Sequence, residues 1–411
     1  MENNASSNDA CACHGASAPR TAGALFCSSA ACAALGALVG FAVWALLSLA
    51  YLLISLIWDN LYNALGAPLV FPVVICTLGG ILAGAWNARF QCAPQSLVKT
   101  LDEVKRTGGY TGGPLGPSCV SFLIPIAFGG SVGPEAGLTG FIARGCTWIG
   151  RSMRAVAARV SGAQEAPFAR WQKCIVYPCG IAGGIAGAWA VTALGGGMEF
   201  PRFDAFAWSF EAAVIAVPLV AVGYALALIN RGATLAARRL SRKFKAHPIA
   251  APALCGLALG AVAVAFPLIL FPGSQQAVEL MGTWQSMPAW ILIVTGIIKA
   301  VFIALCIGLG WNGGPYFPLM FSSISMGYGI AAAAGADPLL CCAVVTASLV
   351  AAFSRKPIVT IVLMLLCFPV QDLPWIAAAA FIGAHLPMPG AKENAQDRDK
   401  KNAPEQGKQI V

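Results

Sequence analysis

The chain has 411 residues, of which 58% are hydrophobic and only 10% are charged. Soluble globular proteins carry about 25% charged residues, so this composition excludes an ordinary soluble domain and indicates a protein that lies in lipid. The net charge of +9 would suit a nucleic-acid-binding protein, but no known binding module accompanies the basic residues, and we predict no nucleic-acid partner.

The two ends of the chain are polar, and apolar stretches fill the sequence between them. We predict disordered tails over residues 1–22 and 391–411, because neither composition can bury enough apolar area to fold alone. The C-terminal tail is too short for a regulatory domain. Residues 23–390 are predicted to form one transmembrane domain, with a first half over about 23–232 and a second half over about 249–390.

The apolar segments predict an all-α polytopic membrane protein. In chain order they are Ala24–Trp58, Pro68–Trp86, Cys119–Ala143, Cys174–Leu194, Ala207–Ile229, Ile249–Phe271, Trp290–Leu309, Phe317–Ala334, Pro338–Phe353 and Pro357–His385. The first is too long for a signal peptide and indicates a retained membrane helix. A spanning helix needs about 20 apolar residues, so the longest segments are expected to contain more than one element. Several are broken by Gly and Pro, which is tolerated at membrane depth only where the backbone is buried in protein or lines a polar cavity.

Basic residues gather in a few predicted connections, which sets the expected orientation in the membrane. Three groups are Arg144, Arg151, Arg154, Arg159, Arg170 and Lys173 in one loop, Arg231, Arg238, Arg239, Arg242, Lys243 and Lys245 in a second, and Arg355 and Lys356 in a third. By the positive-inside rule these loops and the tails face the cytoplasm of a multi-pass cell-membrane protein. The connections around 59–60, 199–204 and 274–285 carry few basic residues and are expected to face outward.

The cysteines and histidines do not form a metal site or a catalytic set in the sequence. Cys11, Cys13 and His14 cluster near the N-terminus, but a structural metal site normally needs four regularly spaced ligands, and we predict no metal and no cofactor. The remaining histidines are His247, in a loop, and His385, near the end of the last helix. No HExxH, nucleophile elbow or P-loop appears, so we do not expect an enzyme.

Two stretches, one in each half, share the pattern Gly-Gly-x-x-x-Pro. The first is Gly129–Pro134 and the second is Gly313–Pro318. Glycine lets the backbone leave helical geometry, and proline is favoured in the first turn of a helix, so each stretch is expected to begin a helix at membrane depth. Two such N-termini facing each other would make an anion site without a full positive charge. Interrupted segments at matching positions are a pointer to a transport site, although simple packing kinks are an alternative.

These motifs resemble the CLC family of chloride channels and transporters, in a bacterial-type form with a divergent first-half motif. Gly310–Met320 (GWNGGPYFPLM) resembles the second-half motif of the family, and Val350–Leu365 resembles the stretch that follows it. Gly130–Pro134 (GSVGP) resembles the first-half motif, and Gly180–Ala188 looks like the small-residue helix after it. The resemblance covers roughly residues 129–369.

The resemblance implies a CLC-like inverted-repeat helical bundle, a homodimer with one pore per subunit, and helix N-termini around a dehydrated chloride. Carried over, the anion pathway would contain Gly130, Ser131, Val132, Gly133, Pro134, Glu135, Gly313, Gly314, Tyr316, Phe317 and Pro318. The backbone amides of Tyr316 and Phe317 would be anion ligands. Pro315 falls at a position whose amide often contributes in the family, and a proline has no N–H to offer.

Several positions depart from the family pattern. The gating glutamate of the family would fall at Val132, and Glu135 lies three residues later, as a substitute gate or as a carboxylate that stabilises a helix N-terminus. The serine-bearing motif has no clean counterpart, so Thr111 within Thr107–Pro114 is a weak candidate beside an ordinary loop. The last helix of the family, with its pore tyrosine, has no counterpart after His385.

A proton-coupled exchanger needs a titratable gate, and Val132 cannot take up a proton. The sequence therefore favours a chloride channel or an uncoupled anion transporter, with the ion bound weakly enough to leave. The alternatives are a chloride/proton or fluoride/proton antiporter that uses Glu135, a non-transporting relative, and a transporter of organic anions. The expected partners are a small inorganic anion, the lipid bilayer and a second copy of the chain, with chloride as the transported ion.

Overall fold

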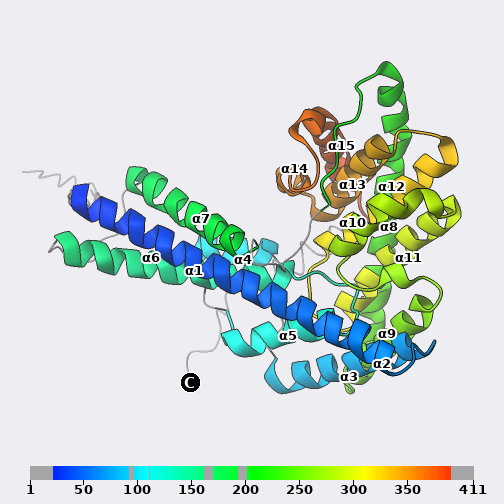
Figure 1. Ribbon diagram of the computed structural model, residues 1–411, viewed down its shortest axis with the longest axis horizontal. Helices are drawn as coiled ribbons and strands as arrows, with labels where there is room; N and C mark the ends of the chain where they lie inside the picture. The colour runs from blue at the N-terminus through cyan, green and yellow to red at the C-terminus, as the bar shows by residue number, and fades with distance from the viewer. Residues whose placement is uncertain (1–21, 92–96, 111, 162–169, 193–200, 390–411) are drawn as a thin grey trace, which may run out of the picture. The chain divides into compact units, whose positions relative to one another are not determined.

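The protein is described by a computed structural model over residues 22–91, 97–110, 112–161, 170–192 and 201–389. Regular structure in these residues is helical, apart from one isolated β-bridge. The α-helices, in chain order, are α1 (Ala22–Ile54), α2 (Tyr62–Ala64), α3 (Phe71–Phe90), α4 (Leu97–Thr107), α5 (Leu115–Ala127), α6 (Glu135–Ser161), α7 (Arg170–Thr192), α8 (Phe210–Lys243), α9 (Ala250–Ala263), α10 (Ser274–Thr283), α11 (Ala289–Gly308), α12 (Tyr316–Ala334), α13 (Pro338–Ser354), α14 (Pro357–Met364) and α15 (Leu373–His385) (Figure 1). The all-α prediction is confirmed.

Six helical stretches in the described residues are long and apolar enough to cross a bilayer. They are Leu25–Ala64, Phe71–Phe90, Trp171–Val191, Phe210–Lys243, Ala289–Gly308 and Tyr316–Ala334. Three shorter apolar helices, α5, α9 and α13, have 10–17 residues. At 1.5 Å per residue a helix of that length falls short of a hydrocarbon layer about 30 Å thick. Short helices beside full-length ones are what a bundle of broken membrane helices requires.

The longest predicted segments contain more than one element, as expected. Cys119–Ala143 divides into α5 and α6 at the first Gly-rich stretch, and Pro357–His385 divides into α14 and α15. Ala24–Trp58 continues to Ala64, through a π-helix over Ser55–Leu61. The prediction of a connection at residues 59–60 was therefore wrong, because that position lies inside the π-helix.

The basic residues assigned to the first two loops lie mostly in helices, which corrects that part of the sequence analysis. Arg144 to Arg159 belong to α6, and Arg231 to Lys243 belong to the end of α8. A basic residue ends an apolar stretch of sequence, but it does not end a helix. Arg and Lys are good helix formers, and they interact favourably with the C-terminal end of the helix dipole. Arg355 and Lys356 do lie between α13 and α14, as predicted.

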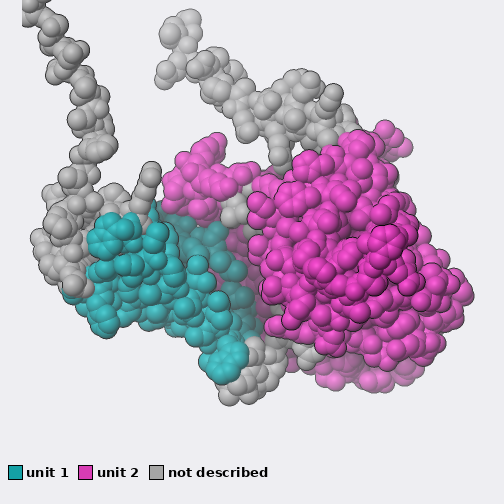
Figure 2. Space-filling model, turned by 90° about the horizontal axis from the view of Figure 1, so that it is seen from above, with its two compact units in different colours: residues 1–45, 142–195 teal, residues 46–141, 196–411 magenta. Residues whose placement is uncertain are grey.

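The chain divides into two compact units, residues 1–45 with 142–195 and residues 46–141 with 196–411 (Figure 2). In the first unit α1 and α7 pack through glycines. A Cβ on Gly36 would collide with the carbonyl oxygen of Gly180, and one on Gly40 with that of Gly184. Small residues at such positions let membrane helices approach backbone to backbone.

The second unit contains the main core. Helix α13 contacts α8, α12, α14 and α15, and α11 contacts α8 and α12, so these helices lie side by side (Figure 1). Helix α3 packs against α5 and α9. Most residues of α12 and α13 are buried, which fixes the direction of both helices. The start of α12 is thereby held inside the protein rather than at its surface. The predicted tails lie almost entirely outside the described residues, and the division into two halves stays a prediction.

Candidate functional site

The two Gly-Gly-x-x-x-Pro stretches lie together in the second unit. Helix α6 begins at Glu135, directly after the first stretch, and α12 begins at Tyr316, within the second. The stretches are joined by the isolated antiparallel bridge, in which Gly133 and Gly314 exchange two N–H···O hydrogen bonds of 2.7 Å each. The prediction that each stretch begins a helix is confirmed, and the two loops that precede these helices are in direct contact.

The bridge is possible because glycine occupies both positions. A Cβ on Gly133 or on Gly314 would collide with the carboxyl group of Glu135. A Cβ on Gly313 would lie 2.5 Å from the Cβ of Val132. The absence of side chains lets the two backbones and one carboxyl group share a very small volume.

The carboxyl group of Glu135 lies between the two loops. Its Oε1 accepts a hydrogen bond of 2.6 Å from the backbone N–H of Tyr316. The N–H groups of Phe317 and of Glu135 itself also face the carboxyl. Its other oxygen, Oε2, is buried and has no hydrogen-bond partner among the described residues. The carboxylate thus takes the position at two helix N-termini that suits a small anion.

The other predicted residues of the first loop are buried. The N–H of Gly130 donates to the carbonyl of Pro125 at 2.7 Å, and the N–H of Val132 donates to Gly130 at 2.8 Å. Val132 is fully buried in an apolar cluster with Trp311. The hydroxyl of Ser131 is buried without a partner in the described part of the chain. Val132 is therefore a packing residue here, and the polar atoms near the loop that lack partners are on Ser131 and Glu135.

In the second loop, Pro315 is the N-cap residue of α12, and Pro318 lies in its first turn, buried. Neither contributes an N–H, so Tyr316 and Phe317 are the first amides of this helix that an anion can meet. Pro134 is also buried and precedes α6. Thr111 lies outside the described residues, and its role stays a prediction.

Sequence reasoning missed a polar network that supports the second loop. The side-chain amide of Asn312 donates to Asn87 Oδ1 and to Ser121 Oγ, each at 2.6 Å. Asn87 in turn donates to the carbonyl of Gly310 at 2.7 Å. The signal was present, since Asn87 and Ser121 are polar residues within apolar helices, but nothing in the sequence pairs them with Asn312.

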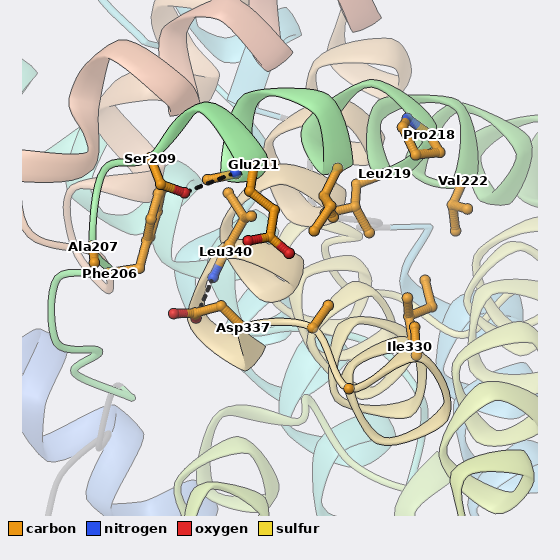
Figure 3. A pocket seen from close by; sticks show the side chains of 15 residues that line it. Phe206, Ala207, Ser209, Glu211, Pro218, Leu219, Val222, Ile330, Asp337 and Leu340 are labelled. Carbon is orange, nitrogen blue, oxygen red and sulfur yellow. Dashed lines mark hydrogen bonds between the residues drawn. The ribbon is translucent and has the colours of Figure 1, made fainter.

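The groove of about 590 Å³ between the start of α8 and the corner between α12 and α13 is a different site (Figure 3). Glu211 and Asp337 line it, and their carboxylates would repel an anion. Asp337 accepts from the N–H groups of Leu339 and Leu340, and Ser209 accepts from Ala212, so both are helix caps. The groove therefore does not suit an anion, whereas the helix N-termini at the two loops do.

Comparison with known proteins agrees with the resemblance seen in the sequence. Residues 192–386 match the family model described as voltage gated chloride channel. The chloride channel protein CLC-f of Arabidopsis thaliana is 36% identical over 88 residues, which is 21% of this chain and 11% of the plant protein. The match thus spans about a tenth of that relative.

Solved structures show the same fold at low sequence identity. A CLC-type fluoride/proton antiporter superposes with a TM-score of 0.64 at 18% identity, over 90% of this chain and 97% of its own. A slow cyanobacterial chloride/proton antiporter gives 0.68 at 16% identity, over 92% and 98%. A eukaryotic CLC transporter gives 0.56 at 15% identity, over 88% and 71%. The sequence match over residues 192–386 and the fold agree: this part of the chain is similar to the voltage gated chloride channel family, and the fold of the chain is that of CLC transporters of known structure.

Proposed function

We propose that this protein is a proton-dependent chloride transporter in which Glu135 is the gate. One observation carries the proposal: Glu135 Oε1 accepts the backbone N–H of Tyr316 at 2.6 Å, at the N-terminus of α12. Chloride is chosen because it is the ion in the description of the matching family. Assembly as a homodimer in the cell membrane, with the basic ends of α6 and α8 in the cytoplasm, is part of the same proposal.

The carboxylate and a chloride ion compete for the same donors. Both are anions, and both are stabilised by unpaired N–H groups and by the positive end of the helix dipole. Chloride can therefore bind only after the carboxylate has left. Protonation removes the charge of the carboxyl and weakens its hold on these N–H groups, because hydrogen bonds to a charged acceptor are about twice as strong as neutral ones. Proton uptake should release the gate.

This geometry favours the antiporter alternative over uncoupled conduction. The aliphatic Val132 cannot bind a proton, but the carboxyl of Glu135, three residues further along the chain, accepts the N–H of Tyr316 and supports the proposed role as the gate. Glycine at positions 133 and 314 leaves room for the carboxyl to lie between the loops. If the carboxyl must be protonated each time it leaves, a proton moves with each cycle.

The test uses purified protein in liposomes under a chloride gradient, with chloride and proton movements recorded together. We expect wild-type protein to move protons against chloride and to transport faster as the pH falls. Glu135→Gln, whose side chain is neutral at every pH, should move chloride without protons and without dependence on pH. Glu211→Gln is the matched control, because this exposed carboxylate lies in the outer groove and should behave as wild type.

Three outcomes would contradict the proposal. If chloride moves without protons, and Glu135→Gln transports chloride at the same rate, the protein is the uncoupled channel or transporter that Val132 predicts. If the wild-type protein transports fluoride and excludes chloride, Glu135 could still be the gate, but the proposed ion would be wrong. Absence of flux for both ions would favour a non-transporting relative.

A further inference from the structure

Lys299 is a fully buried cation in the middle of α11. Its ammonium, which has three N–H donors, lies within hydrogen-bond distance of four successive carbonyl oxygens, those of residues 268–271, at 2.9 to 3.3 Å. It also lies 4.5 Å from the centroid of the Phe321 ring. In the described part of the chain no carboxylate is among its hydrogen-bond partners. A buried charge must be compensated, and here peptide dipoles and one aromatic face do so.

The four carbonyls belong to the end of a short 3₁₀-helix over Pro267–Ile269 and to the two residues that follow it. In the segment between α9 and α10, Phe271 has a φ of +62° and Gly273 has a φ of +94°. A left-handed conformation is unfavourable for a residue with a side chain, so Phe271 must be held in it by its surroundings. The ammonium of Lys299 supplies much of that fixation, because it binds the carbonyl of Phe271 at 3.0 Å and those of the residues just before it.

The fixed segment is bonded to the first Gly-rich loop. The N–H of Phe271 donates to the carbonyl oxygen of Gly129 at 3.2 Å. Gly129 begins the Gly129–Pro134 stretch, and the other end of that stretch forms the bridge to Gly314. The lysine is therefore connected to the bridge by two hydrogen bonds, through Phe271 to Gly129, and then by the covalent chain from Gly129 to Gly133.

We propose that Lys299 is a positioning residue for the anion site. It acts through the 268–271 segment, which sets the position of the first loop relative to α12. Phe321 belongs to α12 and contacts the same ammonium. The side chain of Lys299 therefore contacts both α12 and the segment that holds the first loop, and it helps to fix their relative positions. This inference goes beyond the role of Glu135, but it rests on the proposed anion pathway.

The test measures equilibrium binding of chloride to the purified full-length protein by calorimetry, beside thermal unfolding. We expect Lys299→Met to raise the Kd for chloride about tenfold, which equals about 1.4 kcal/mol. Lys299→Arg should recover most of the affinity, because it keeps the charge and several donors. Ser325→Ala is the matched control: it removes a buried hydrogen bond of 2.8 Å from α12 to Leu292 of α11, without touching the 268–271 segment. Its Kd should equal that of wild type.

The inference is overturned if Lys299→Met binds chloride as wild type does, or if Ser325→Ala weakens binding equally. If Lys299→Met does not fold, the same comparison is made with Lys299→Gln. Failure of both uncharged variants to fold would also overturn it, because the lysine would then serve the fold rather than the site. Wild-type protein that binds no chloride would refute the proposed function itself, a result distinct from wild-type binding that Lys299→Met leaves unchanged.

Discussion

The two Gly-rich loops share a pattern but are fixed in place by different means. The second loop carries its own anchors. Trp311 is fully buried and donates from Nε1 to the carbonyl of Pro252 at 2.9 Å, and Asn312 joins the network with Asn87 and Ser121. The loop therefore has side chains inside its own motif that hold it against α3, α5 and α9.

The first loop has no such side chains. Its anchors come from elsewhere: Trp58 donates from Nε1 to the carbonyl of Ala127 at 3.0 Å, just before the loop, and Phe271 donates to Gly129. The rings of Trp58 and Phe271 are in edge contact, with centroids 5.1 Å apart. The residues that hold the second loop in place belong to the motif itself, so a short stretch of sequence contains both the loop and its anchors. The residues that hold the first loop lie far from it in the sequence, which makes its motif harder to recognise.

The largest effect is expected at the self-anchored loop. Trp311→Ala should lower the free energy of unfolding by about 3–5 kcal/mol, because it empties a buried site and removes the hydrogen bond to Pro252. Chloride binding should be lost with it. Thermal unfolding in detergent measures the first effect and calorimetry the second. Trp290→Ala is the control, since Trp290 is 61% exposed and should tolerate the change. Equal losses in both variants would mean that Trp311 is not a special anchor.

A smaller effect is expected where the loops meet. Gly314→Ala should cost about 1–3 kcal/mol of stability, because the new methyl group collides with the carboxyl of Glu135. Since Gly314 does not have a positive φ, the backbone itself accepts alanine. The displaced carboxyl should also leave transport less dependent on pH.

A double variant separates this collision from general damage. In a Glu135→Ala background the Gly314→Ala change should cost much less, since its collision partner is gone. Gly282→Ala in α10 meets no neighbouring atom within 4 Å and should be neutral or slightly stabilising. Additive costs of the two changes at 135 and 314 would show that the bridge, and not the carboxyl, is what the methyl group disturbs.

The smallest effect is expected at Ser131 in the first loop. Its hydroxyl is buried without a partner among the described residues, so Ser131→Ala should leave stability unchanged or raise it by up to about 1 kcal/mol. Thermal unfolding is the measurement. A clear loss of stability would mean that the hydroxyl has a partner, and that the first loop does carry an anchor of its own.

The sequence predicted the helical fold and the places where α6 and α12 begin, because Gly and Pro act on the local backbone. It did not predict that α6 and α8 continue through their basic residues, since apolar windows end at charges. The network of Asn87, Ser121 and Asn312 joins positions about two hundred residues apart, and no local pattern reports such a contact.

The position of Lys299 in the sequence indicates a functional residue, which we did not predict. It is a lone charge in an apolar span, and an ionisable residue at such a position is a functional hypothesis by default. Its partners are carbonyl groups of a separate segment, which no side-chain pattern identifies. The proposed gate shows the same limit, because the register of the motif indicated Val132, while the path of the backbone brings the carboxyl of Glu135 to the amides of α12.

The bridge between Gly133 and Gly314 has a consequence for how long an ion stays. Each glycine uses its N–H on the other, and Pro315 has none, so these three positions give nothing to the coordination shell of an ion. The N–H groups that face the carboxyl of Glu135 are those of Glu135, Tyr316 and Phe317. Under the proposed function, an ion between the loops would have fewer N–H ligands than two separate helix N-termini offer, and weak binding is what lets a conducted ion leave. The bridge that joins the two loops would thus also favour release of the ion.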